Sequence, residues 1–185
     1  GDTWSGHAKN PEMPGAPDSL VYDSVYGLVW RYPAMTKIAV QSIAHAALKT
    51  PDLERSLAFY RDTLGFEEMM RINNPDGSLM LVYLRMTDTQ YIEIFPGGQG
   101  AIAPDWGDTA INHFCLQVAD IQATAADLRA RGIKFLVEPQ LGLDGNWQCW
   151  IGDPDGNRIE FMQMMPGCMQ ELAIKRLNGK YENCH

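Results

Sequence analysis

The 185-residue sequence lacks any apolar run of about 18 residues, so it offers no candidate for a membrane-spanning helix. Basic residues are also scarce, because 15 Lys and Arg stand against 23 Asp and Glu and the formal net charge is −8. Nucleic-acid backbones and anionic membranes both need a basic surface, and we expect neither as a partner. Apolar residues make up 45% of the chain, which is typical of an ordinary globular domain or of two small modules that share a core.

Cysteine is sparse, and its spacing argues against one common kind of metal site. The four cysteines, Cys115, Cys149, Cys168 and Cys184, include no C-x-x-C pair, so we expect no zinc site built from thiolates. Cys115 and Cys149 lie in apolar, strand-like runs without an activating base nearby in the sequence, and we expect both to be small buried hydrophobic residues. Free thiols are compatible with a reducing compartment, and we expect a cytoplasmic location.

Residues 1–40 differ in composition from the rest of the chain. Residues 10–19 (NPEMPGAPDS) are rich in Pro, Gly and polar residues and predict an N-terminal arm or linker. Residues 19–30 (SLVYDSVYGLVW) are apolar and aromatic, and we expect them to pack on the main domain or on a second subunit, with a lid over a pocket as the alternative. The main domain is predicted over residues 41–165, followed by a tail at 166–185 that can hold a helix over residues 169–177 (MQELAIKRL).

A regular pattern begins at residue 43 and predicts one strand, one helix and three further strands. Thr50 is suited to the N-cap of the helix, Pro51 to its first position and Asp52 to its first turn, and Gly65 is expected to end it. One face of this helix is apolar, formed by Leu53, Leu57, Tyr60 and Leu64. The strands are predicted over residues 43–49 (IAHAALK), 66–72 (FEEMMRI), 78–86 (SLMLVYLRM) and 90–95 (QYIEIF).

The same order of elements recurs after a connector rich in Gly and Pro. Asp120 is expected to cap the second helix and Gly132 to end it. The second set of strands is predicted over residues 111–118 (INHFCLQV), 133–138 (IKFLVE), 146–153 (NWQCWIGD) and 157–163 (NRIEFMQ). Corresponding residues of the two copies lie about 68 positions apart, which identifies an internal repeat. The sequence therefore predicts an α+β fold of two β-α-β-β-β modules, at about 41–96 and 109–165.

Two histidines and two glutamates stand at equivalent places in the two copies. His45 and His113 lie on the first predicted strand, and Glu93 and Glu160 lie on the last. Side chains alternate between the faces of a sheet, so each glutamate shares its face with largely apolar neighbours, where an unpaired carboxylate is costly. Arg158 could neutralise Glu160 through an ordinary salt bridge, but Glu93 has no comparable neighbour in the sequence.

A divalent metal ion would satisfy both imidazoles and both carboxylates at once. A single histidine on a strand is more often structural than a ligand, but the repetition of a His–Glu pair favours metal binding. We therefore predict that His45, Glu93, His113 and Glu160 bind one ion. Mixed nitrogen and oxygen donors suit zinc or nickel, which we expect first, and also cobalt, manganese or ferrous iron.

Two segments of the sequence resemble a known family. They are residues 48–67 (LKTPDLERSLAFYRDTLGFE) and residues 151–163 (IGDPDGNRIEFMQ). Both are similar to the vicinal-oxygen-chelate superfamily, which includes glyoxalase I, bleomycin resistance proteins, extradiol dioxygenases, methylmalonyl-CoA epimerase and fosfomycin-resistance proteins. The resemblance covers about residues 40–164. It implies paired βαβββ modules whose mixed sheets curl around a central metal ion.

The order His, Glu, His, Glu is most similar to that of glyoxalase I, the lactoylglutathione lyase. In this superfamily the extradiol dioxygenases and fosfomycin-resistance proteins use two histidines and one glutamate, and the epimerases typically have glutamine where this chain has Glu93. The resemblance implies a lyase or isomerase whose substrate binds the metal through adjacent oxygens and passes through an enediolate. It also implies that Glu160 is the base that moves the proton and that Glu93 is its catalytic counterpart.

The resemblance further implies a small-molecule substrate, which could be an adduct of glutathione or another thiol, and a homodimer. Arg61 and Arg71 are the candidates for binding such a substrate, with an ordinary surface charge as the alternative for each. Three other functions remain open from the sequence. They are a ring-cleaving dioxygenase, an epimerase and a non-catalytic small-molecule binding protein of the same superfamily.

Overall fold

A computed structural model describes residues 19–23, 27–31, 38–100 and 103–179 of the chain. The chain divides into two compact units, Gly1–Ser42 and Ile43–His185. In the first unit β1 (Ser19–Asp23) and β2 (Gly27–Arg31) pair as an antiparallel hairpin. The predicted linker at 10–19 lies outside the described residues except for its last position, and the packing or lid role of residues 19–30 stays a prediction.

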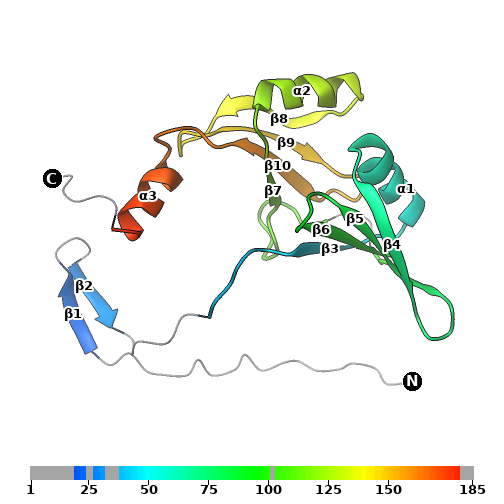
Figure 1. The fold of residues 1–185 in the computed structure, drawn as a ribbon, viewed down its shortest axis with the longest axis horizontal. Helices are drawn as coiled ribbons and strands as arrows, with labels where there is room; N and C mark the ends of the chain where they lie inside the picture. The colour runs from blue at the N-terminus through cyan, green and yellow to red at the C-terminus, as the bar shows by residue number, and fades with distance from the viewer. Residues whose placement is uncertain (1–18, 24–26, 32–37, 101–102, 180–185) are drawn as a thin grey trace. The chain divides into compact units, whose positions relative to one another are not determined.

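The second unit begins with one complete β-α-β-β-β module. Its helical part is α1 (Leu53–Leu57), which continues as a π-helical turn, η1 (Ala58–Thr63). Its strands are β3 (His45–Lys49), β4 (Glu67–Asn73), β5 (Leu79–Arg85) and β6 (Tyr91–Phe95). They form a mixed sheet in the order β3-β6-β5-β4, in which β3 is parallel to β6 and the other pairs are antiparallel (Figure 1).

The second module repeats this topology. It consists of β7 (Phe114–Gln117), α2 (Ile121–Ala130), β8 (Phe135–Leu141), β9 (Trp147–Gly152) and β10 (Arg158–Gln163). The sheet order is β7-β10-β9-β8, with β7 parallel to β10. The predicted α+β class and the β-α-β-β-β repeat are therefore confirmed. The predicted C-terminal helix is also present, as α3 (Met169–Leu177).

The start of the first helix differs from the prediction. Thr50 is not the N-cap, because α1 begins only at Leu53; the backbone N–H of Thr50 still donates to the carbonyl of Phe95 and extends the sheet. Asp52 caps α1 instead, accepting a hydrogen bond from the backbone N–H of Arg55 at 3.1 Å. Gly65 ends the helical segment as predicted, with φ of +84°, a conformation that glycine adopts without strain.

One continuous core joins the two modules on the helix-facing sides of their sheets. Its buried members come from both modules, and they are Leu57, Phe59, Tyr60, Val82, Leu84, Ile92, Ile94, Ile121, Leu128, Cys149, Ile151, Ile159 and Phe161. Polar contacts reinforce the junction. The hydroxyl of Tyr60 donates to Asp153 at 2.8 Å, and Asp155 pairs with Arg55 and accepts from Ser56 at 3.3 Å. The turn between β9 and β10 thus connects the second module to the helix of the first.

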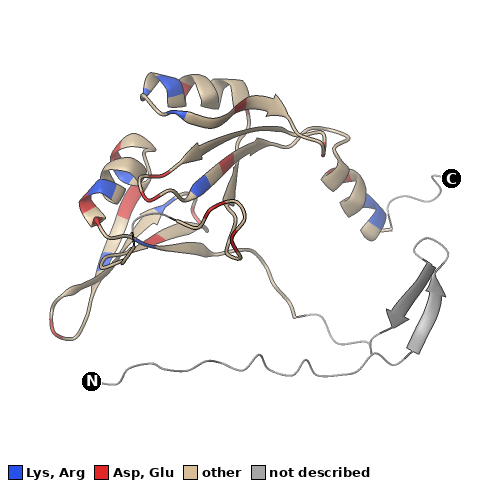
Figure 2. Cartoon of the chain, turned by 180° about the vertical axis from the view of Figure 1, so that it is seen from behind, with Lys and Arg blue, Asp and Glu red and all other residues tan. Residues whose placement is uncertain are grey.

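Among the described residues of the second unit no helix packs on the opposite face of either sheet (Figure 1). We call these two surfaces the inner faces. The inner face of the first sheet includes His45, Tyr83 and Glu93, and that of the second includes Trp150 and Glu160, as the strand registers require. The helical side carries acidic and basic positions side by side on α1 and α2 (Figure 2).

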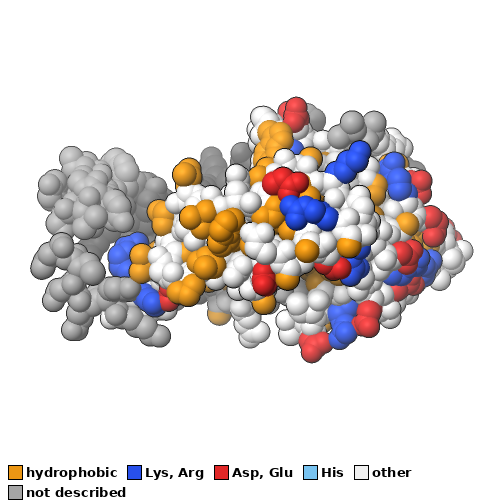
Figure 3. All heavy atoms as spheres, turned by 90° about the horizontal axis from the view of Figure 1, so that it is seen from above, with side chains coloured by type: hydrophobic (Ala, Val, Ile, Leu, Met, Phe, Trp, Pro, Cys, Tyr) orange, Lys and Arg blue, Asp and Glu red, His pale blue; other side chains and the backbone are white. Residues whose placement is uncertain are grey.

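The C-terminal helix α3 contributes exposed apolar side chains to the surface. Met169, Ile174 and Leu177 are all more than half exposed. Figure 3 shows one face of the protein on which apolar side chains gather into a patch beside charged ones. Among the described residues no helix is long and apolar enough to cross a membrane.

The hydrogen bond between Tyr60 and Asp153 gives a test of the module junction. Burial, followed by the Asp153 carboxylate, raises the pKa of Tyr60 well above its usual value, so the hydroxyl keeps its proton and remains the donor. We expect Tyr60→Phe to lower the free energy of unfolding by about 1–3 kcal/mol in urea denaturation. The matched control is Tyr91→Phe, which removes only an exposed bond to the carbonyl of Asp88 and should change stability by less than about 0.5 kcal/mol. Equal effects of the two variants would contradict this account.

Candidate functional site

The first His–Glu pair lies on the inner face of the first sheet. His45 begins β3, and Glu93 is the middle residue of β6, the strand parallel to it. The Nε2 atom of His45 lies 3.7 Å from a carboxylate oxygen of Glu93. Glu93 is only 7% exposed, whereas the side chain of His45 is 48% exposed. A nearly buried carboxylate thus faces an imidazole that solvent and ligands can reach.

The second pair repeats this arrangement with a shorter contact. Nε2 of His113 lies 3.2 Å from a carboxylate oxygen of Glu160, and the Glu160 side chain is 12% exposed. His113 was predicted inside a strand over residues 111–118, but β7 begins only at Phe114. The reason is that parallel pairing with β10 starts at Phe114 opposite Ile159, so His113 belongs to the connector and not to the ladder.

Within one copy the structure forms two separate pairs. The described residues contain no group of three or more His, Cys, Asp or Glu side chains placed to hold one metal ion. Each pair supplies one nitrogen and one oxygen donor, a set that divalent transition metals accept, but a zinc-type centre takes three or four protein ligands. The chemistry of each pair therefore fits half of a metal centre. The predicted four-residue ligand set stays a prediction.

Tyr83 is a further polar residue of the first inner face, and it was not among the residues predicted from the sequence. It stands directly opposite Glu93 in the antiparallel pairing of β5 and β6. Its hydroxyl donates to the Glu93 carboxylate, and that hydrogen bond raises the pKa of Tyr83. The hydroxyl therefore stays protonated and holds Glu93 from the side away from β3. Only the strand register reveals this contact, because the two residues lie on different strands.

Cys115 departs from the prediction, whereas Cys149 follows it. Cys149 is fully buried, but Cys115 is exposed on the inner face, directly opposite Glu160. The neighbours Phe114 and Leu116 pack against the core, so alternation along β7 turns Cys115 outward. Local desolvation, followed by the charge of Glu160, raises the pKa of the Cys115 thiol to about 12. It is therefore a protonated neighbour of Glu160 and not a reactive thiolate.

Aromatic rings line the second pair. Trp150 stands opposite Glu160 in the register of β9 and β10, and its ring centroid lies 4.4 Å from that of His113. Trp106 extends this wall, with its centroid 5.6 Å from that of Trp150. The guanidinium of Arg158 lies 4.3 Å from the ring centroid of Trp106. Among the described residues no ion pair joins Arg158 to Glu160, so the salt bridge considered from the sequence does not form.

Arg61 and Arg71 lie apart from both pairs. Each forms an ion pair with Glu68, at 3.2 Å and 2.7 Å respectively. Arg71 stands opposite Val82, which belongs to the helix-facing core, so its side of the sheet is the reverse of the one that carries Glu93. Within one copy these arginines form a surface charge cluster, and a substrate-binding role for them stays a prediction.

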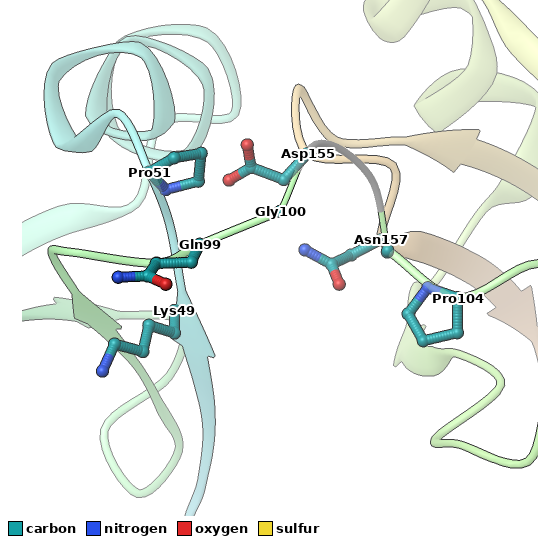
Figure 4. Close-up of a pocket in the computed structure, with 9 residues that line it drawn as sticks. Lys49, Pro51, Gln99, Gly100, Pro104, Asp155 and Asn157 are labelled. Atoms are coloured by element: carbon teal, nitrogen blue, oxygen red, sulfur yellow. The ribbon is translucent and has the colours of Figure 1, made fainter.

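A cavity of about 200 Å³ lies near the far end of β3 from His45. Figure 4 shows Lys49, Pro51 and Gln99 on one side of it and Pro104 and Asn157 on the other. None of the four predicted metal ligands lines it. The cavity is therefore separate from the chemistry of the two pairs.

Comparison with known proteins agrees with this fold. A family model described as the glyoxalase/bleomycin resistance protein/dioxygenase superfamily matches residues 42–161. An ethylmalonyl-CoA/methylmalonyl-CoA epimerase of Cereibacter sphaeroides is 29% identical over 134 residues, covering 69% of this chain and 93% of that protein. A lactoylglutathione lyase of Haemophilus influenzae is 30% identical over 128 residues, covering 65% of this chain and 91% of that protein.

A solved structure supports the same assignment. The crystal structure of a putative glyoxalase family protein from Bacillus anthracis is 25% identical, with a TM-score of 0.56, and the match covers 70% of this chain and 100% of that one. The family match spans both β-α-β-β-β modules and ends just after Glu160. The chain belongs to the glyoxalase/bleomycin resistance protein/dioxygenase superfamily.

Proposed function

We propose that this protein is a metal-dependent enzyme that moves a proton at a carbon next to a carbonyl group, and that its reaction is of the lactoylglutathione lyase type. The observation that carries the proposal is the repeated His–Glu pair, at 3.7 Å and 3.2 Å, on the helix-free face of each sheet. The substrate class would be a small molecule with adjacent oxygens, such as a thiol hemithioacetal. Similarity to a lactoylglutathione lyase at 30% identity supports this choice.

We further propose that each complete site is shared by two copies of the chain. One copy offers two ligands at each of two places, and neither place holds a third acidic, histidine or cysteine ligand among the described residues. Among the described residues of the second unit no helix packs on the inner faces, and a sheet normally buries both faces or solvates one with polar groups. Half-exposed Met70 and Trp106 are apolar side chains that a second copy would cover. The site would then combine His45 and Glu93 of one protomer with the His113–Glu160 pair of its partner.

The side chains of such a site would have distinct tasks. A divalent cation held by the four groups would stabilise negative charge on the substrate oxygens when a proton leaves the adjacent carbon. Glu160 would leave the cation, accept that proton and return it to the neighbouring carbon. Its carboxylate lies beside His113 and the protonated thiol of Cys115. Glu93, fixed by the hydroxyl of Tyr83, would remain a ligand.

A second candidate is epimerisation of an acyl-CoA with a carbonyl-activated carbon. The relative that favours it is the ethylmalonyl-CoA/methylmalonyl-CoA epimerase, which is 29% identical over 134 residues. Both reactions begin by removing a proton from a carbon beside a carbonyl, and they differ in which carbon receives the proton. The two functions would therefore share the same metal ligands and Glu160 as a base, but epimerisation would also need a second proton-transferring group on the opposite face of the carbon.

Replacement of the proposed base should separate chemistry from folding. We expect Glu160→Gln to lower turnover of the methylglyoxal–glutathione hemithioacetal by about 10²–10⁴-fold in the zinc- or nickel-loaded protein, because general bases contribute that range. Glu138→Gln, at a surface glutamate of the same module, should leave turnover unchanged. Parallel assays with racemic methylmalonyl-CoA assign the substrate. Wild-type protein that binds metal but is inactive on both substrates would contradict the two candidate reactions.

Metal binding should be visible in thermal stability. Glu93 is nearly buried beside a partly exposed imidazole, so without metal the neutral Glu93→Gln side chain should cost little or even stabilise the protein. Zinc at one hundred times its Kd would stabilise the wild type by about 2.7 kcal/mol, seen as a higher Tm, and we expect the variant to lose most of this increase. Glu138→Gln again serves as the control. Equal zinc-dependent increases in all three proteins would remove Glu93 from the ligand set.

Shared sites predict complementation between inactive variants. His45→Ala destroys the first His–Glu pair and Glu160→Gln destroys the second, so the homodimer of either variant should be inactive. A heterodimer would keep one intact site, formed by the unaltered half of each copy, and an equal random mixture should recover about a quarter of wild-type activity. Refolding the two variants together and assaying turnover checks this. No recovery, despite heterodimers detected by mass spectrometry, would show that each site is built within one copy.

A further inference from the structure

Asn112 makes a contact that determines how its neighbour His113 can act. The side-chain oxygen of Asn112 lies 2.9 Å from Nδ1 of His113. An amide oxygen can only accept, so this contact is a hydrogen bond when Nδ1 carries the proton. The other ring nitrogen, Nε2, is the atom that lies 3.2 Å from Glu160. The two nitrogens of this imidazole therefore face two different partners.

Arg158 holds Asn112 in the position that this contact needs. Its Nε donates to the backbone carbonyl of Asn112 at 2.8 Å, and Nη1 donates to the carbonyl of Pro104 at 3.1 Å. The same guanidinium lies over the ring of Trp106, and Arg158 is only 8% exposed. A buried, always charged side chain thus connects two points of the segment that leads into β7, Pro104 and Asn112. On the other side of His113, Trp150 packs against the imidazole ring.

The first module provides an internal comparison. The residue before His45 is Ala44, which has no polar side chain, and no described residue bonds to Nδ1 of His45. The histidine–glutamate contact is longer there, 3.7 Å against 3.2 Å, and the His45 side chain is more exposed than that of His113. Two histidines at equivalent repeat positions are thus held differently, and the difference begins with the residue that precedes each one.

We infer that Asn112, held in place by Arg158, is a positioning residue that keeps the proton of His113 on Nδ1 and leaves Nε2 free to bind the metal. The inference rests on the proposed metal centre. It adds the tautomer of His113 and names Asn112 as the side chain that selects that tautomer. A metal-binding nitrogen must carry no proton, and neutral imidazole has only one. Glu160 acts in the opposite sense, because its carboxylate accepts from Nε2–H; the two acceptors therefore compete for the single proton, and removing Asn112 leaves Glu160 unopposed. Metal would then have to displace that proton as well.

The test compares Asn112→Leu, which removes the acceptor at similar size, with Asn112→Asp, which restores one. The tautomer is read in metal-free protein by long-range ¹H–¹⁵N correlation of the His113 ring, and zinc affinity is read by competition with a chromophoric chelator. We expect the His113 ring of the Leu variant to carry its proton on Nε2. We also expect this variant to bind zinc about 10–100-fold more weakly, because the loss of a hydrogen-bond partner of a metal-binding histidine commonly has an effect of that size. The Asp variant should return both readouts close to the wild type.

Asn178→Leu, at the C-cap that follows α3, is the matched control, since it makes the same exchange at an exposed asparagine outside the family match. It should leave the tautomer and the zinc affinity unchanged, and thermal unfolding checks that every variant is folded. An Asn112→Leu protein that keeps the proton on Nδ1, or an Asn112→Asp protein as weak as the Leu variant, would overturn the inference. Wild-type protein that binds no zinc would instead contradict the proposed metal centre, while the tautomer in metal-free protein still decides the role of Asn112.

Discussion

Parallel pairing of the first and last strands of each module is the constraint on which the rest of the structure depends. Neighbouring parallel strands need a crossover connection, and here α1 or α2 and the two intervening strands supply it. The crossover brings His45 beside Glu93 and His113 beside Glu160, although the two members of each pair lie far apart in the chain. The same crossover places a helix on one face of each sheet. The connection that builds the core therefore also creates the two polar pairs on the opposite face.

This division assigns stability and chemistry to different faces of the sheets. The core residues and the Tyr60–Asp153 hydrogen bond lie on the helix side and across the junction of the modules. The inner faces carry carboxylates, imidazoles, a phenol hydroxyl and a thiol, which contribute little to burial of apolar surface. Substitutions there can alter ligands without opening the core, because alternation along a strand separates the two sets of side chains. A repeated module also lets the two polar pairs diverge independently while the fold is kept.

The sequence was sufficient for features that depend on local periodicity. Alternating and helical patterns located both modules, the caps and glycine stops were mostly correct, and α3 has the predicted bounds. The errors arose where contacts between distant segments decide the outcome. Thr50 still pairs with Phe95, so α1 starts three residues later and Asp52 is its cap, and His113 precedes β7 because pairing with β10 starts one residue later.

The partners of the predicted ligands follow the same rule. The strand register places Tyr83 and Trp150 opposite the glutamates of the two pairs, and the alternation of side chains along β7 exposes Cys115 on the inner face. Neither register nor alternation can be fixed until it is known which strands pair and which face a helix covers. Asn112 is adjacent to His113 in the sequence, but its relevance depends on the ring orientation, which Arg158 and Trp150 help to set.

The differences between the two His–Glu pairs bear on the choice between the proposed reactions. Epimerisation at one carbon requires proton transfer on both faces of that carbon, so two groups must each be able to gain and lose a proton. Isomerisation between adjacent carbons can be completed by one base that carries the same proton. Here Glu93 accepts a phenol hydrogen bond and stands beside a loosely held histidine, whereas Glu160 adjoins a thiol and a histidine held by Asn112 and Trp150. Two copies of one module have thus acquired unequal surroundings for their carboxylates. Unequal surroundings fit the proposed lyase reaction, in which one carboxylate would remain a ligand and the other would move the proton.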